Sequence, residues 1–199
     1  IRNDRLGDLM LILPALRIIK SSIPDIEIDC LADESYKSLS LLSGDIDNII
    51  FDANLYKSIS KQSYNYSISF FSTINIAYKL WRSNIKRRYA PATKLAQLFS
   101  NRTIKQNRSK SLKPEYEYNN DLACYFLKDN GFEINRIDTP FIKLSTQNMI
   151  KDESKNNIFI HPFTGGSSKT LSGNDFINLC LELNKLCSCR FILHCDKYD

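Results

Sequence analysis

Apolar residues recur at helical spacing immediately after the first eight residues of the chain. Six of them fall on one face of a helix: Leu9, Ile12, Leu13, Leu16, Ile19 and Ile23. Pro14 lies inside this run, so we expect it to start a fresh helical turn or to bend the helix. The pattern therefore predicts an amphipathic helix that closes at Pro24.

Short apolar runs then alternate with helical segments. We expect strands at 26–31, 49–51, 66–71 and 86–90, and helices at about 35–42, weakly between 51 and 66, and from a cap at 72–73 to about 81. Strands that are joined through helices pair in parallel, so this order predicts an α/β fold with a parallel sheet covered by helices.

The middle of the chain separates a basic segment from another helix. Residues 101–113 are polar and basic and predict a loop. Pro114 stands where a helix begins and Gly131 where it ends. We expect four side chains of this helix to form its buried stripe: Tyr118, Leu122, Tyr125 and Phe126.

Polar residues from 145 to 157 follow a predicted strand at 140–144 and indicate a linker, which we place at 148–157. Residues 1–147 then form an N-terminal α/β domain. Residues 158–199 begin a second unit, with strands at 158–161 and 190–195 around a helix at 174–186. Because this small unit cannot bury both faces of a sheet, and because Ile1 already stands in the first strand, we expect a chain truncated at both ends.

The composition is that of a globular protein, with 43% hydrophobic and 25% charged residues. The longest apolar runs are too short for a membrane span or a signal peptide, so we expect a cytoplasmic protein. Six cysteines occur without a C-x-x-C pair and with only two histidines. We therefore expect reduced core thiols and no metal site, and we attribute the spacing of Cys187 and Cys189 to packing.

The net charge of +5 is mild, but the basic residues form two clusters, at 82–94 and 102–113. This clustering favours an anionic partner, either a phosphorylated substrate or an acidic lipid surface, although a solvated surface explains it equally well. Aromatic residues are not interleaved with these charges, so we do not expect a nucleic-acid partner.

Two polar loops each follow a predicted strand and open a helix, which is where α/β domains place their chemistry. The first contains Gly7 and Asp8 and offers a carboxylate. The second runs from Thr164 to Lys169 and offers backbone amides, hydroxyls and a lysine. Asp8 is either a general base or the N-cap of the helix, and the second loop is either a phosphate cradle or a turn.

The run from Arg2 to Leu16 has the form R-x-D-x-x-G-D-x(5)-P-A-L, and the segment 160–169 contains Ile-His-Pro, two glycines and a lysine. In both motifs the chain resembles glycosyltransferase family 9, whose best-known members are the lipopolysaccharide heptosyltransferases. The resemblance implies a GT-B architecture. In that architecture two Rossmann-like domains hold the acceptor mainly on the N-terminal side and the nucleotide sugar mainly on the C-terminal side.

The resemblance also implies roles for individual residues. Asp8, beside Gly7, matches the family's catalytic base in an inverting transfer, and Lys169 matches a lysine that contacts the donor's phosphates. Residues of the same loop would bind the diphosphate: Thr164, Gly165, Gly166 and Ser168. The implied reaction is transfer of heptose from ADP-heptose, without a metal, to a lipopolysaccharide core or a related anionic glycolipid or glycan. The implied place is the cytoplasmic face of the inner membrane, with peripheral membrane contact.

Two alternatives remain at this point. Phe163 stands where the family usually has Gly, and Thr170-Leu171-Ser172 replaces a common Trp-Pro, which favours a degenerate, non-catalytic nucleotide-binding module. A Rossmann-type oxidoreductase ranks lower, because no G-x-G-x-x-G follows a predicted strand. We expect His161 and His194 to be structural, and this fragment alone to be inactive.

Overall fold

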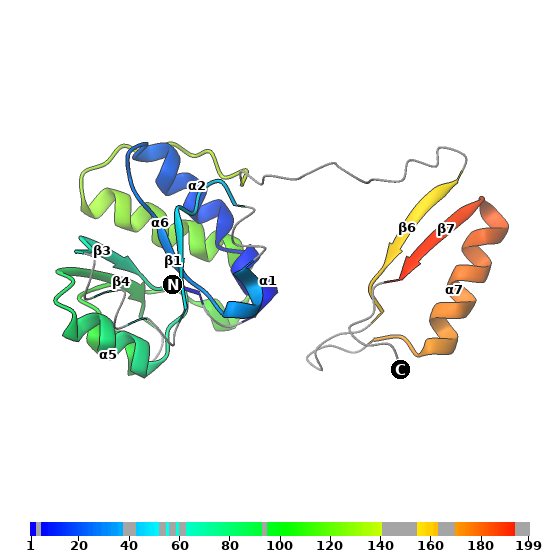
Figure 1. Cartoon of the computed structure of the whole chain (residues 1–199), viewed down its shortest axis with the longest axis horizontal. Helices are drawn as coiled ribbons and strands as arrows, with labels where there is room; N and C mark the ends of the chain where they lie inside the picture. The colour runs from blue at the N-terminus through cyan, green and yellow to red at the C-terminus, as the bar shows by residue number, and fades with distance from the viewer. Residues whose placement is uncertain are drawn as a thin grey trace. The chain divides into compact units, whose positions relative to one another are not determined.

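The computed structural model describes residues 1–2, 5–37, 43–51, 55, 59, 63–92, 95–140, 155–162 and 170–193. The chain divides into two compact units, Ile1–Ser145 and Thr146–Asp199 (Figure 1). Both units combine helices with parallel strands, so the predicted α/β class is confirmed.

Parallel strand pairs form the framework of the first unit. β1 (Asp29–Leu31) pairs with β2 (Asn48–Ile50). β4 (Arg87–Pro91) lies between β3 (Tyr66–Ile68) and β5 (Arg102–Ile104) and is parallel to both. These pairings align the carboxyl ends of β3, β4 and β5 at one edge, where α/β proteins bind ligands.

The first two residues connect these strand pairs. The Arg2 amide donates to the Leu31 carbonyl at 3.1 Å, and the Phe70 amide donates to the Ile1 carbonyl at 3.1 Å. The Ile1 ammonium donates to the Ile68 carbonyl at 2.7 Å. Ile1 and Arg2 thus lie between β1 and β3, beside the carboxyl ends of both strands.

The prediction of a loop at 101–113 is wrong for the three residues of β5. The Asn101 amide donates to the Arg88 carbonyl at 3.2 Å, and the Ala92 amide donates to the Ile104 carbonyl at 2.9 Å. β5 is short and polar and, among the described residues, pairs only with β4, so periodicity alone does not reveal it. A short 3₁₀ turn, η4 (Arg108–Lys110), follows.

The first predicted helix, from Leu9 to Ile23, consists of two helices, as the position of Pro14 indicates. α1 (Leu6–Met10) ends at Leu11, and α2 (Leu13–Ser22) begins with Pro14 in its first turn, where a missing amide hydrogen costs nothing. α2 packs on α6 (Glu115–Asp129) through buried apolar side chains that include Leu16, Ile19, Leu122 and Phe126.

Two predicted helix boundaries are confirmed. α5 (Ile74–Arg82) begins after Thr73, whose hydroxyl accepts the Ile76 amide at 3.3 Å. α6 starts after Pro114, and Gly131 follows its end with a φ of 74°, a conformation that suits glycine. The described part of this unit also contains two short 3₁₀ segments, η1 (Glu34–Tyr36) and η3 (Leu95–Phe99).

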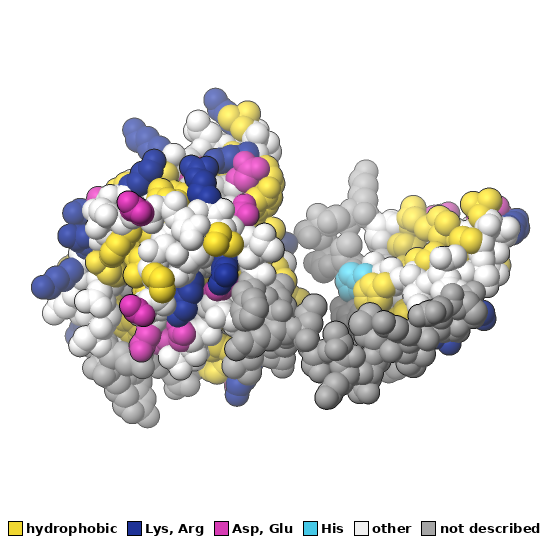
Figure 2. Space-filling model, turned by 90° about the horizontal axis from the view of Figure 1, so that it is seen from above, with side chains coloured by type: hydrophobic (Ala, Val, Ile, Leu, Met, Phe, Trp, Pro, Cys, Tyr) yellow, Lys and Arg dark blue, Asp and Glu magenta, His cyan; other side chains and the backbone are white. Residues whose placement is uncertain are grey.

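The second unit contains β6 (Asn156–Ile160), α7 (Gly173–Leu186) and β7 (Cys189–Leu193), with β6 and β7 parallel. β6 begins two residues before the predicted strand and so takes in the end of the predicted linker. Ser172 and Asp175 form a reciprocal capping box on α7. Hydrophobic side chains gather on an exposed face of this unit (Figure 2), and Phe159 is 64% exposed. The predicted strand at 140–144 lies almost wholly outside the described residues.

The described cysteines are unpaired, but they do not all lie in the core. Cys30 is buried, whereas Cys187 is exposed, and its Sγ lies 3.4 Å from Sγ of Cys189. The described residues contain no cluster of three metal-ligating side chains. Among the helices of these same residues, none has both the length and the apolar character to cross a bilayer.

A buried tyrosine ties β4 to the end of α6. The Tyr89 hydroxyl donates to Asp129 Oδ2 at 2.6 Å and accepts from Asn130 Nδ2 at 2.8 Å, while its ring meets Phe126 edge-on. Burial, together with the neighbouring Asp129 carboxylate, raises the pKa of Tyr89 to about 12. The hydroxyl therefore stays protonated and keeps donating.

We predict that Tyr89→Phe lowers the free energy of unfolding by about 1 to 2 kcal/mol, because two buried hydrogen bonds are lost. Tyr125→Phe is the matched control, since the Tyr125 ring packs against Tyr89 but its hydroxyl has no bond to a described residue. The hydrogen bond from Tyr89 also lowers the pKa of Asp129. The difference in the free energy of unfolding between the two variants should therefore shrink as the pH falls below 3.8, the usual carboxyl pKa. Urea unfolding at several pH values measures the free energy of unfolding. Equal losses of this free energy in Tyr89→Phe and Tyr125→Phe would contradict the prediction.

Candidate active site

A cavity of about 160 Å³ lies at the carboxyl ends of β3 and β4. Its lining includes Arg2, Ser69, Ser72, Arg108 and Glu115. Ligands of α/β sheets bind at this edge, outside the ends of parallel strands. The cavity therefore places the candidate active site at the carboxyl ends of β3 and β4.

Asp8 contacts one of the residues that line this cavity. Its Oδ1 lies 2.7 Å from a terminal nitrogen of Arg2, and its side chain is 29% exposed. Asp8 is the third residue of α1, whose N-cap is Arg5, so the alternative role of Asp8 as the N-cap is wrong. A Cβ added at Gly7 would meet no described atom within 4 Å, so the space beside the carboxylate is open.

Arg2 is buried, with only 5% of the residue exposed. Besides Asp8 it faces Glu115, whose Oε1 lies 3.7 Å from the other terminal nitrogen. The guanidinium carbon lies 5.7 Å from the centre of the Phe71 ring. Two carboxylates and one aromatic face thus compensate the burial of this charge.

The network continues from Glu115 back to α1. Glu115 pairs with Arg108, and Arg108 donates to Asn119 Oδ1 at 3.3 Å. Fully buried Asn119 donates to the carbonyl of Leu11, the C-cap of α1, at 2.9 Å. Burial lowers the pKa of Arg108, although Glu115 opposes this shift. The network thereby holds α1 at two points, the side chain of Asp8 and the carbonyl of its C-cap Leu11.

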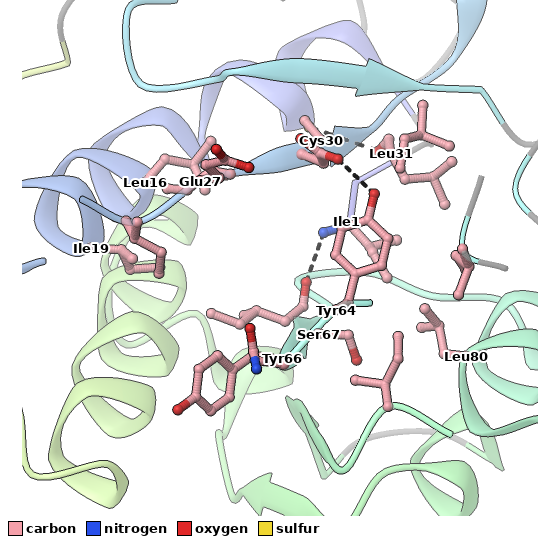
Figure 3. A pocket seen from close by; sticks show the side chains of 18 of the residues that line it. Ile1, Leu16, Ile19, Glu27, Cys30, Leu31, Tyr64, Tyr66, Ser67 and Leu80 are labelled. Carbon is pink, nitrogen blue, oxygen red and sulfur yellow. Dashed lines mark hydrogen bonds between the residues drawn. The ribbon is translucent and has the colours of Figure 1, made fainter. Parts of the chain in front are cut away.

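A larger cavity of about 590 Å³ lies elsewhere in the first unit (Figure 3). Most of its lining residues are apolar, among them Leu16, Ile19 and Leu80, and both β1 and β3 contribute to it. Its polar residues include Tyr64, whose hydroxyl donates to Asp29 Oδ2 at 2.6 Å. Arg2, the ion-pair partner of Asp8, lines the smaller cavity but not this one, so we do not assign the chemistry to the larger cavity.

The second predicted loop lies outside the described residues, and with it Thr164, Gly165, Gly166, Ser168 and Lys169. Its flanks are described. The loop leaves the carboxyl end of β6 and leads to α7, and the Thr170 hydroxyl donates to the Pro162 carbonyl at 2.7 Å. This is the kind of connection that binds phosphate in α/β units.

No family model matches the sequence. A curated protein of Haemophilus influenzae, described as a putative glycosyltransferase, is 32% identical over 97% of this chain and 62% of that protein. Among solved structures, E. coli heptosyltransferase WaaC with ADP-2-deoxy-2-fluoro heptose matches with a TM-score of 0.74 at 16% identity, over 98% of this chain and 67% of that chain. The family 9 glycosyltransferase of Veillonella parvula matches with a TM-score of 0.70 at 12% identity, over 96% and 60%.

The chain has the fold of the family 9 heptosyltransferases. The predicted resemblance to glycosyltransferase family 9 and the GT-B fold class are thereby confirmed. The chain spans about three fifths of the length of the curated relative that it matches.

In this family 9 fold the basic residues are less available than their clustering in the sequence suggests. Arg88 turns inward and donates to the Phe99 carbonyl at 2.7 Å. Arg102 pairs with Asp129, Arg108 with Glu115 and Lys113 with Asp121. On the face of the first unit seen in Figure 2, basic side chains lie close to acidic ones. Part of the second cluster therefore stabilises the fold.

Sequence reasoning missed three members of the network around Arg2. The helix start predicted at Pro114 gives no role to Glu115, and the clustering of basic residues gives no specific partner to Arg108. The predicted stripe does not include Asn119, although the structure buries it and leaves Tyr125 only half-buried. A signal for Asn119 was present, because it occupies the core face between Tyr118 and Leu122.

We predict that Arg2→Met lowers the free energy of unfolding by about 2 kcal/mol, because Asp8 and Glu115 lose their shared cation. Arg5→Met is the matched control, since Arg5 is exposed in the same segment. Urea denaturation measures both. Equal stability of the Arg2 variant and the parent would show that the network does not support the fold.

Proposed function

We propose that the protein is a glycosyltransferase of family 9 and that Asp8 is its general base. The observation that carries the proposal is the Asp8 carboxylate, which is partly exposed, ion-paired with Arg2 and adjacent to open space at Gly7. The shared fold and the similarity to the putative glycosyltransferase of Haemophilus influenzae support this reading.

In the proposed reaction an acceptor hydroxyl attacks the anomeric carbon of the donor. The new bond forms on the face opposite the departing diphosphate, so the configuration inverts. The hydroxyl proton passes to Asp8 as the bond to the diphosphate breaks. A positioned base of this kind contributes a rate factor of about 10² to 10⁴.

We propose that the donor is a nucleotide sugar, and specifically ADP-heptose. The solved relatives that match include WaaC with ADP and WaaC with ADP-2-deoxy-2-fluoro heptose. Backbone amides of the loop after β6, together with Thr164, Ser168 and Lys169, would hold the diphosphate, and Gly165 and Gly166 would let it approach. These groups would stabilise the charge that develops on the leaving group, so we propose no metal requirement.

We propose an anionic glycolipid or glycan as the acceptor, either a lipopolysaccharide core or a related surface glycan. The excess of basic residues over acidic ones supports an anionic acceptor. Such an acceptor is anchored to a membrane, so the proposed place of action is the cytoplasmic face of the inner membrane.

A second candidate is a module that binds a nucleotide sugar without transferring the sugar. Phe163 favours it, because a bulky residue stands where family 9 usually has glycine. The two candidates differ in turnover and not in binding, so an assay must measure both quantities.

We predict that Asp8→Asn in the full-length protein lowers kcat about 10²-fold or more and leaves the Kd of the nucleotide sugar unchanged. The amide keeps the size of the carboxylate but cannot take the proton. Asp138→Asn, at an exposed position, is the control. Release of nucleoside diphosphate measures turnover, and unchanged turnover would remove Asp8 from the mechanism.

We predict that Lys169→Ala weakens nucleotide-sugar binding about tenfold, because one charge-assisted contact to the diphosphate is lost. Lys155→Ala is the matched control, since Lys155 is exposed at the other end of β6. Isothermal titration calorimetry measures the affinity. Equal affinity for the two variants would rule out contact between Lys169 and the donor.

A further inference from the structure

The outer side of α5 and the neighbouring η3 expose a group of large apolar side chains. We call this group the α5–η3 surface. Its members are between 39% and 75% exposed: Ile74, Tyr78, Trp81, Leu95 and Leu98. Single exposed apolar residues are ordinary, but a contiguous group marks a surface with a partner.

Contacts among aromatic rings join the two elements of this surface. The Tyr78 ring centre lies 5.8 Å from that of Trp81 and 5.6 Å from that of Phe99, and Trp81 lies 6.1 Å from Phe99. The Phe99 carbonyl accepts a 2.7 Å hydrogen bond from Arg88, which connects η3 to β4. Helix α5 and η3 therefore pack against each other and expose their apolar residues side by side.

Burial in the core does not account for three apolar side chains of α5. The helix packs on the core through Ile76, Ala77 and Leu80, which are buried. The exposed positions of a surface helix are normally polar. In α5 they include Asn75 and Arg82, but also the large apolar residues Ile74, Tyr78 and Trp81.

The stretch of sequence that contains α5 and η3 carries charges of a single sign. No Asp or Glu occurs from Ala53 to Pro114, whereas this stretch contains thirteen Lys and Arg residues. Lys79 and Arg82 belong to α5 itself, and exposed Lys86 follows four residues after its end. Exposed Trp, Tyr and Leu combined with Lys and Arg are the composition that binds the interface of an anionic membrane.

The inner side of η3 reaches the candidate active site. Ala96 and Gln97 line the 160 Å³ cavity together with Arg2, which holds Asp8. An acceptor anchored in a membrane below the α5–η3 surface would therefore emerge next to this cavity.

We propose that the α5–η3 surface docks the protein on an anionic lipid bilayer, with Trp81, Leu95 and Leu98 entering the headgroup region. The inference goes beyond the proposed function, because binding to lipid is measured without turnover. Only the arrival of the acceptor beside Arg2 rests on the proposed function.

The test is sedimentation of the protein with vesicles of phosphatidylcholine containing phosphatidylglycerol, and with vesicles of phosphatidylcholine alone. We expect binding to the anionic vesicles that weakens as salt rises, and little binding to the neutral ones. Leu98→Ser should weaken binding about tenfold, since a leucine no longer enters the interface. Leu112→Ser is the matched control, because Leu98 and Leu112 are both 75% exposed. Both substitutions lie on the surface, and thermal unfolding verifies that the variants are folded.

Trp81 supplies a second readout, because it is the single tryptophan of the sequence. Its emission should shift to the blue when anionic vesicles are added, and to a smaller degree in Leu98→Ser. The proposal is overturned if anionic vesicles do not bind, or if Leu98→Ser and Leu112→Ser bind equally. It is also overturned if the protein forms a dimer without lipid that Leu98→Ser abolishes, since a second copy then covers the surface. Asp8→Asn should bind vesicles like the parent, which separates this test from that of the proposed function.

Discussion

The arrangement around the candidate site depends on one buried cation, the guanidinium of Arg2. Its burial is costly unless partners compensate it, and Asp8, Glu115 and the ring of Phe71 do so. Glu115 in turn pairs with Arg108, and Asn119 closes the network on the C-cap of α1. The orientation of Asp8 is therefore determined by residues of α6 more than a hundred positions later in the chain. A short helix such as α1 is marginal by itself, and this network explains how it holds a carboxylate in place.

The parallel strand topology determines where this local network lies in the sheet. Because Ile1 and Arg2 lie between β1 and β3, the chain emerges at the edge where β3 and β4 end, and Asp8 follows there. η3 lies at the same edge and has two different sides. Ala96 and Gln97 face the cavity, and Leu95 and Leu98 are exposed. A proposed base and a proposed lipid-binding surface are thus connected through a few residues of one short segment.

The sequence predicted the helices and most strands because their apolar spacing and capping residues act locally. Thr73, Pro114 and Gly131 mark helix ends by their own backbone and side-chain chemistry. β5 could not be predicted in this way, since its three residues become a strand only through pairing with β4. In the site, Asp8 was found through a motif. Its partners Arg2, Glu115, Arg108 and Asn119 come from separate segments, and only the tertiary structure brings them together. The sequence did not predict the ion pairs of Arg102 and Lys113, because their acidic partners lie on α6.

In the proposed reaction Arg2 positions Asp8 through their ion pair. A double-mutant cycle on kcat measures this coupling, with Arg2→Lys, Asp8→Asn and the combined variant assayed as folded full-length proteins. We expect strong non-additivity: Arg2→Lys lowers kcat in the parent but has little further effect once Asp8 is replaced by Asn. If the two effects multiply, Arg2 and Asp8 act independently, and Arg2 does not position the base.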